Sequence, residues 1–203
     1  MRFFTKCLFM LLLSSPVVLY ANDLDSIKNE CFSKFNRDSL KTGFFYKDSI
    51  AFIFTAPDGW LLDNYSAVSQ GLPAVFYPIG QTWKDSPVIM YARARKISKD
   101  ISTIKKQVNE TVRSFRAEGS LKYQTQFIEH YKIDDKRSFD IYHYWGDKWG
   151  NYEAAGYIVD HGYIVFFILN AKNKKVFNGS IKSFKELLRS YLFVTNNISY
   201  EYK

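Results

Sequence analysis

The chain has 203 residues, a formal net charge of +8 and an aromatic content of 18%. Its length suits one domain of ordinary size, and the 18 Phe, 15 Tyr and 4 Trp side chains can fill a substantial core. Lys and Arg never form a dense run, so the positive charge indicates a well-solvated basic surface and argues against a specific nucleic-acid site.

Residues 1–21 have the pattern of a secretory signal peptide. Arg2 and Lys6 precede an apolar run at 8–13, and small residues end the segment before Asn22. The apolar run is shorter than the roughly 20 residues that cross a bilayer, so we expect cleavage and no transmembrane segment afterwards. Cleavage lowers the formal charge from +8 to +6. The pattern therefore predicts a periplasmic or secreted bacterial protein.

The segment 22–40 is predicted to be helical. Four of its apolar residues follow helical spacing on one face: Leu24, Ile27, Cys31 and Phe35. Cys31 is the only cysteine left after cleavage, which excludes a disulfide within the chain. A buried thiol, which the spacing favours, an intermolecular disulfide and a reactive nucleophile stay open.

The next part of the chain predicts strands. Residues 43–57 indicate a hairpin, because apolar and polar residues alternate on both sides of a short polar turn. Residues 61–73 are expected to form an irregular loop. Short strands are predicted at 74–77 and at 87–95.

A long amphipathic helix is predicted from Asp100, its capping residue, to a stop at Gly119. Residues 121–133 then alternate between apolar and polar, which is typical of a half-buried antiparallel strand. In that strand Phe127 is expected on the apolar face. A turn follows at 134–137.

Three further strands are predicted at 139–145, 152–159 and 163–169, the last two joined by a tight turn at His161 and Gly162. The strand 163–169 is apolar on both faces, so it is expected at the centre of the sheet, covered on both sides. A final helix is predicted from Asn178 to Tyr191.

This order predicts an α+β fold with a mainly antiparallel sheet flanked by helices. We expect a single domain at 41–195, preceded by the signal peptide 1–21 and the helical segment 22–40. A polar C-terminal tail at 196–203 is expected to follow it.

Over residues 43–195 the sequence resembles the PsbP-like fold. The features that carry the resemblance are the hairpin ending in Pro57–Trp60, the long central helix, the antiparallel meander and a closing helix with Phe184, Leu187 and Tyr191. The family includes the photosystem protein PsbP, the Ran-binding factor Mog and small bacterial envelope proteins. The resemblance implies an α/β/α sandwich that serves as a binding or assembly module, usually without catalysis. It transfers no functional residue.

No catalytic, metal-binding or cofactor-binding motif is recognisable, so we expect no enzyme, no metal and no cofactor. Each of the three histidines has a structural explanation. His130 is expected on an outer face, and His161 in a turn with left-handed backbone. His143 falls on an apolar face, where it is either a core residue or part of a ligand pocket. Asp140 lies on the opposite face and cannot share a metal ion with it.

The best candidate site is a cluster of rings. Its members are Tyr142, His143, Tyr144, Trp145, Trp149 and Tyr152, with Trp83 as a second exposed candidate. Flat rings beside polar groups can bind a sugar, a nucleobase or a peptide. The alternative is that Trp145 belongs to the core and Trp149 shields the end of a hairpin.

The sequence favours an exported, non-enzymatic module that recognises a protein or envelope component, with an immunity or inhibitor role as a special case. One alternative is a carrier of a small ligand, with an aromatic pocket around Trp145–Trp149 and His143 inside it. Another is a hydrolase that uses Cys31 or a carboxylate.

Overall fold

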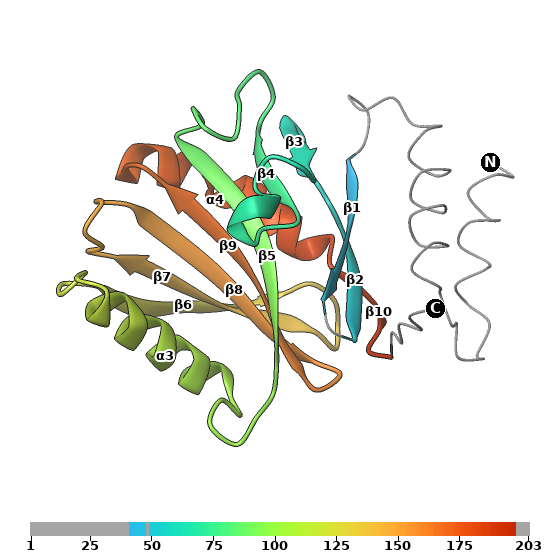
Figure 1. Ribbon diagram of the computed structural model, residues 1–203. Coiled ribbons are helices and arrows are strands. Elements are labelled where there is room, and N and C mark those ends of the chain that lie inside the picture. Colours follow the sequence, from blue (N-terminus) through green and yellow to red (C-terminus); the bar gives the residue numbers. More distant parts are fainter. Residues whose placement is uncertain (1–40, 48, 198–203) are drawn as a thin grey trace, which may run out of the picture.

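Two antiparallel β-sheets form the framework of the computed structural model (Figure 1). The larger has seven strands, in the spatial order β3 (Trp60–Asp63), β4 (Val75–Pro78), β5 (Val88–Lys96), β9 (Tyr163–Ala171), β8 (Tyr152–Asp160), β7 (Ser138–Trp145) and β6 (Gln124–Lys132). The smaller has three, in the order β1 (Thr42–Lys47), β2 (Ile50–Thr55) and β10 (Leu192–Thr195). Two α-helices, α3 (Ile104–Ala117) and α4 (Lys174–Arg189), complete the fold with a short 3-10 helix, η2 (Val68–Gln70). The predicted α+β class with antiparallel sheets is confirmed.

The structure describes residues 41–47 and 49–197. The predictions about the signal peptide, the helical segment 22–40, Cys31 and the tail from 198 onward lie outside these residues. Neither α-helix of the described part is long and apolar enough to span a bilayer.

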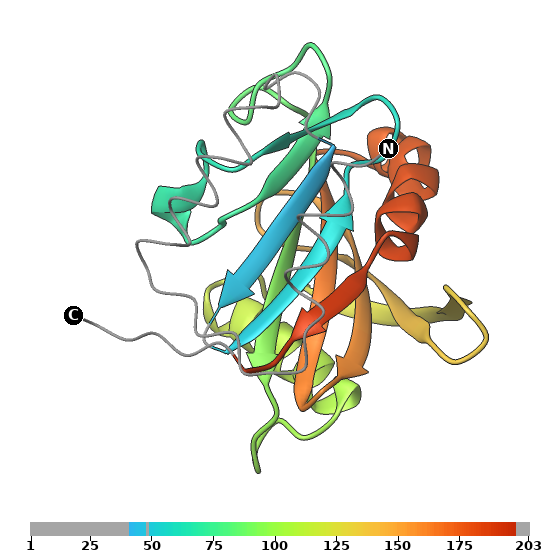
Figure 2. The ribbon, with the colours of Figure 1, turned by 90° about the vertical axis from the view of Figure 1, so that its right-hand side faces the viewer.

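The large sheet separates two layers. One of its faces packs against α4 and the small sheet, which crosses in front of it in Figure 2. Phe52, Phe54 and Phe167 meet there with ring centroids 5.8–6.0 Å apart and no exposed surface. Each such ring contributes about 1.5–3 kcal/mol when it leaves water. The opposite face is covered by α3 at one end and by the loop carrying η2 at the other.

Both helices begin at other residues than the sequence predicted. Helix α3 starts at Ile104, because Thr103 is extended and its side chain accepts the Lys106 amide. Asp100 therefore does not cap it. Helix α4 starts at Lys174, four residues before the predicted start, with Asn173 accepting the Val176 amide. This early start places Phe177 in the core.

Most predicted strands are confirmed, and two were missed. The loop predicted at 61–73 contains the end of β3, which pairs with β4. Strand β10 follows α4 and pairs with β2, which ties the end of the domain to its beginning. Both missed strands have four residues.

Strand β9 lies at the centre of the large sheet, as predicted, between β5 and β8. On the α4 face its residues Val165, Phe167 and Leu169 are fully buried. On the other face Phe166 and Ile168 are only half-buried. Strand β9 is therefore covered on both sides, as expected, but less completely on this second face, where Ile164 is fully buried and Phe166 and Ile168 pack partly buried against the cluster beneath α3.

Candidate functional site

The large sheet divides the predicted ring cluster between its two faces. Alternation along β7 places Tyr142 and Tyr144 on the α3 face and His143 on the α4 face. The hydroxyl groups of Tyr144 and Tyr157 are hydrogen-bonded at 2.8 Å beneath α3. These rings therefore do not form a single pocket, because they lie on opposite faces of the sheet.

On the α4 face, His143 lies edge-on to Phe177 with ring centroids 4.9 Å apart. Tyr152 approaches the same Phe177 ring at 6.1 Å. Half-burial lowers the pKa of His143, so its neutral form is favoured. Trp145, which pairs with Tyr152 across the strands, is half-buried. These contacts give His143 and Tyr152 a packing role at the start of α4.

The two remaining tryptophans lie in separate places. Trp83 was expected to be exposed, but it is half-buried. It packs against Val75 and Tyr77, which belong to the apolar cluster beneath the η2 loop. Trp149 is 61% exposed in the turn between β7 and β8, and the Lys148 ammonium lies 4.5 Å from its ring centroid. Trp149 is thus the member of the predicted set that is most available to a partner.

The turn that carries Trp149 is well ordered by hydrogen bonds. The Asp147 carboxylate accepts the amides of Trp149 and Asn151. Lys148 joins the turn to the segment after α3, because its amide donates to Ser120 Oγ and its Nζ donates to the Glu118 carbonyl. Leu121, on that segment, is 79% exposed. We call the exposed pair Leu121 and Trp149 the apolar tip.

A groove of about 460 Å³ runs between α3 and β6. It is lined by one stripe of the helix and the first residues of the strand: Asn109, Val112, Arg113, Arg116, Gln124 and Thr125. We call it the basic groove. The sequence does not predict this groove; the helical spacing of Asn109, Arg113 and Arg116 indicates only that they share one face of α3.

The two arginines of the basic groove are held differently. Arg116 Nε donates to the Tyr123 carbonyl at 2.8 Å, which lays the guanidinium along the start of β6. No hydrogen bond of its Nη groups joins another residue within 41–47 and 49–197. Arg113 Nη2 lies 2.6 Å from Glu110 Oε2, and its side chain is 78% exposed. Both guanidinium groups therefore have donors left for an anionic group.

A buried network supports the residue that positions Arg116. The Tyr123 ring is stacked between Phe115, at 4.2 Å, and Tyr144, at 5.6 Å. Its hydroxyl donates to Glu153 Oε2 at 2.5 Å, and Asn170 Nδ2 donates to Glu153 Oε1 at 2.5 Å. Burial raises the pKa of Glu153 against the opposing effect of these two hydrogen bonds. The network fixes Tyr123 and thereby the carbonyl that holds Arg116.

Strand β6 is less buried than predicted. It lies at the edge of the sheet, and its pairing with β7 shifts register between Phe127 and Glu129. Phe127 and Ile128 are 41% and 39% exposed at this bulge. Phe127 lies on the predicted apolar face, where its ring packs edge-on against Tyr142 with centroids 5.4 Å apart, but at the edge of the sheet it is more exposed than the alternation predicted.

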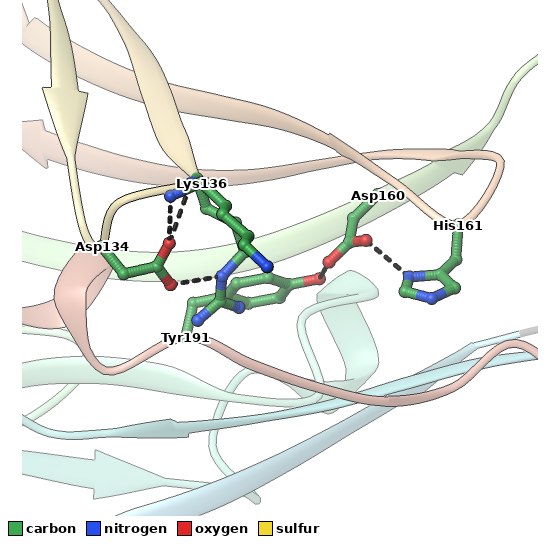
Figure 3. A network of polar contacts seen from close by, with 6 residues as sticks. Asp134, Lys136, Asp160, His161 and Tyr191 are labelled. Carbon is green, nitrogen blue, oxygen red and sulfur yellow. Dashed lines mark hydrogen bonds and ion pairs between the residues drawn. The ribbon is translucent and has the colours of Figure 1, made fainter.

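A second polar network lies at the far end of β8 (Figure 3). The Asp160 carboxylate contacts His161 Nδ1 at 2.5 Å and accepts the Tyr191 hydroxyl at 2.9 Å. The His161 ring stacks on Phe193 of β10 at 3.6 Å, and its backbone has φ 46°, as the turn prediction required. These contacts join the β8–β9 turn to the small sheet, which gives His161 a structural role.

The structure also shows the surroundings of His130 and of the pair Asp140 and His143. His130 is exposed, as expected, and its Nδ1 lies 2.6 Å from Asp140 Oδ1 on the neighbouring strand. Asp140 and His143 point to opposite faces of β7. Among the described residues, no three His, Cys, Asp or Glu side chains are grouped so that they can hold a metal ion.

A scan against protein-family models and a search of curated proteins found no match to this chain. Among solved structures, the chain is similar to cyanobacterial PsbP from Synechocystis sp. PCC 6803, at 15% identity and a TM-score of 0.45, over 76% of this chain and 93% of that chain. It is also similar to the Ran-binding protein Mog1p of Saccharomyces cerevisiae, at 12% identity and a TM-score of 0.45, over 76% and 95%. A mutant Mog1 protein gives 12% identity and a TM-score of 0.42, over 75% and 96%. These are representatives of the PsbP and Mog group that the sequence resembles. At these scores the likeness carries no argument about function, and the fold class rests on the strands and helices described above.

Proposed function

We propose that the protein is an exported, non-enzymatic module that binds another protein through the basic groove and the apolar tip. The observation that carries the proposal is their adjacency. The segment between Glu118 and Gln124 connects α3 to β6, and Lys148 bonds this segment to the turn that presents Trp149. Tryptophan and arginine are the residue types enriched at energetic hot spots of protein interfaces, and this surface presents both.

The periplasmic or secreted location in this proposal rests on the signal-peptide pattern of residues 1–21. In that location the partner is a protein or an envelope component. An immunity or inhibitor role is one form of such binding, and it requires that the partner be a toxin or enzyme whose activity the protein blocks.

The test is a capture experiment with matched variants. The mature chain is immobilised and exposed to envelope extract at low and physiological salt. The groove variant is R113E with R116E, and the tip variant is Trp149→Ala. The control is K174E with K175E on α4, which changes the formal charge by the same amount on the other face of the sheet.

We expect the control variant to retain every partner that the wild-type chain captures. The groove and tip variants are each expected to lose a partner at least tenfold, and the loss in the groove variant should be largest at low salt. Equal capture by the groove variant, the tip variant and the control would contradict the proposal. Turnover of a generic substrate by the wild-type chain would contradict the non-enzymatic part of it.

A further inference from the structure

The free edge of β6 indicates how a partner can engage the basic groove. Within the described residues, β6 pairs with β7 alone. In an antiparallel strand, every second residue directs its backbone N–H and C=O away from its one paired neighbour. Such an edge is a template for an additional strand.

The register of β6 limits where a strand can be added. The bulge between Phe127 and Glu129 interrupts the ladder and twists the second half of the strand away from a regular edge. The regular part is Gln124–Phe127. Gln124 and Thr125, at its start, also line the basic groove. The segment that can accept a strand thus coincides with the segment that faces the groove.

Helix α3 forms the second wall beside this edge. A peptide paired with Gln124–Phe127 would direct alternate side chains toward the α3 side of the sheet. There they meet Val112, Arg113 and Arg116. Peptide recognition between a sheet edge and a neighbouring helix combines backbone hydrogen bonds for affinity with side-chain contacts for specificity.

Charge decides which peptide fits. The guanidinium groups of Arg113 and Arg116 are suited to bidentate contacts with carboxylates. A second copy of the mature chain would bring the same arginines and a formal net charge of +6 to the contact. The opposite edge, β3, is a poor alternative, because it has four residues and ends in Asp63, whose carboxylate is occupied by Tyr65, Ser66 and Tyr77.

We propose that the basic groove binds an extended acidic segment of a partner protein, which adds as an eighth strand along Gln124–Phe127 and places alternate carboxylates on Arg113 and Arg116. This inference rests on the proposed binding function and specifies its ligand and its geometry.

The experiment uses the mature chain and three synthetic peptides. The first is a fluorescently labelled eight-residue peptide of alternating Glu and Val. The second has the same sequence with N-methyl groups on alternate residues, which removes backbone donors without changing charge. The third replaces Glu by Lys. Binding is measured by fluorescence anisotropy, and protection of amides is measured by hydrogen exchange.

We expect the acidic peptide to bind at least tenfold more tightly than the N-methylated and the Lys peptides. It should slow amide exchange at residues 124–127 and leave residues 60–63 of β3 unchanged. The variant R113E with R116E should lose the binding at least tenfold, while K174E with K175E should keep it.

Three results would overturn the inference: no binding of the acidic peptide, equal binding of its N-methylated form, or binding without protection of residues 124–127. Concentration-dependent dimerisation that protects the same residues would also overturn it, in favour of a second copy. In each case the proposed function still stands if the groove variant loses its captured partner, so the two failures are distinguishable.

Discussion

Removing the hydroxyl of Tyr123 tests how much its hydrogen bond to Glu153 stabilises the fold. The substitution Tyr123→Phe keeps the ring between Phe115 and Tyr144 and removes only the donor to Glu153. Glu153 is 8% exposed, so water cannot readily replace that donor. A hydrogen bond to a charged, buried group contributes about 1.5–3 kcal/mol. We therefore expect a loss of about 2 kcal/mol at a pH high enough to ionise Glu153 in the folded state.

The loss should depend on pH. Burial raises the pKa of Glu153 in the folded state above its value in the unfolded chain. Protonated Glu153 therefore favours folding. Its contribution to the free energy of unfolding is fully present below the pKa of the unfolded chain and is lost as the pH rises through the pKa of the folded state. Without the Tyr123 donor the folded pKa rises further. At low pH the substitution removes only a hydrogen bond between neutral groups, about 1 kcal/mol.

The measurement is urea unfolding of Tyr123→Phe and wild type at pH 4 and pH 7.5. The matched control is Tyr163→Phe, which removes a hydrogen bond to Ser49 from a buried tyrosine without a carboxylate partner. Its loss should be the same at both pH values. For a domain of this size, 2 kcal/mol corresponds to a fall in Tm of about 4–8 °C. A loss for Tyr123→Phe that is no larger at pH 7.5 than at pH 4 would refute the account of Glu153.

Three further predictions concern packing, capping and the apolar tip. In Gly156→Ala the new Cβ would meet Leu188 Cδ1 at 2.7 Å, so we expect a loss of about 1–3 kcal/mol in urea unfolding, and Leu188→Ala should cost less in this background than in the wild type because it relieves the clash. Thr103→Ala should cost about 1 kcal/mol and Asp100→Ala less than about 0.5 kcal/mol; the reverse order would show that Asp100 caps α3 after all. Trp149→Ala should change the free energy of unfolding by less than about 0.5 kcal/mol, because the ring is exposed, and a larger loss would mean that Trp149 is a packing residue rather than a contact for a partner.

Much of the fold follows from local patterns. Alternation in β7 correctly assigned His143 to the apolar face with Phe139, and the turn chemistry at His161 and Gly162 correctly predicted left-handed backbone there. Helix starts were less predictable. Thr103 and Asp100 are both good capping residues, and in the structure Thr103 caps the helix while Ile101, between them, lies in the buried cluster beneath α3.

The candidate site was only partly predictable. Trp149 was identified because its neighbours are Gly and polar residues, a local feature. The predicted ring cluster does not form one surface, because neighbouring residues of a strand point to opposite faces of a sheet. The basic groove joins residues of α3 to residues of β6, and no local spacing shows that two such elements leave a gap between them.

The sequence by itself determined the order of the longer strands and of helices α3 and α4, their apolar faces and the positive charge, because these depend on periodicity and composition within short windows. The tertiary structure decided which strand became a free edge, which carboxylate was buried and which arginines kept unpaired donors. Those properties depend on contacts between distant segments: the Glu153 carboxylate receives hydrogen bonds from Tyr123 and Asn170, and β6 is an edge because no further strand pairs beyond it in the described part of the chain.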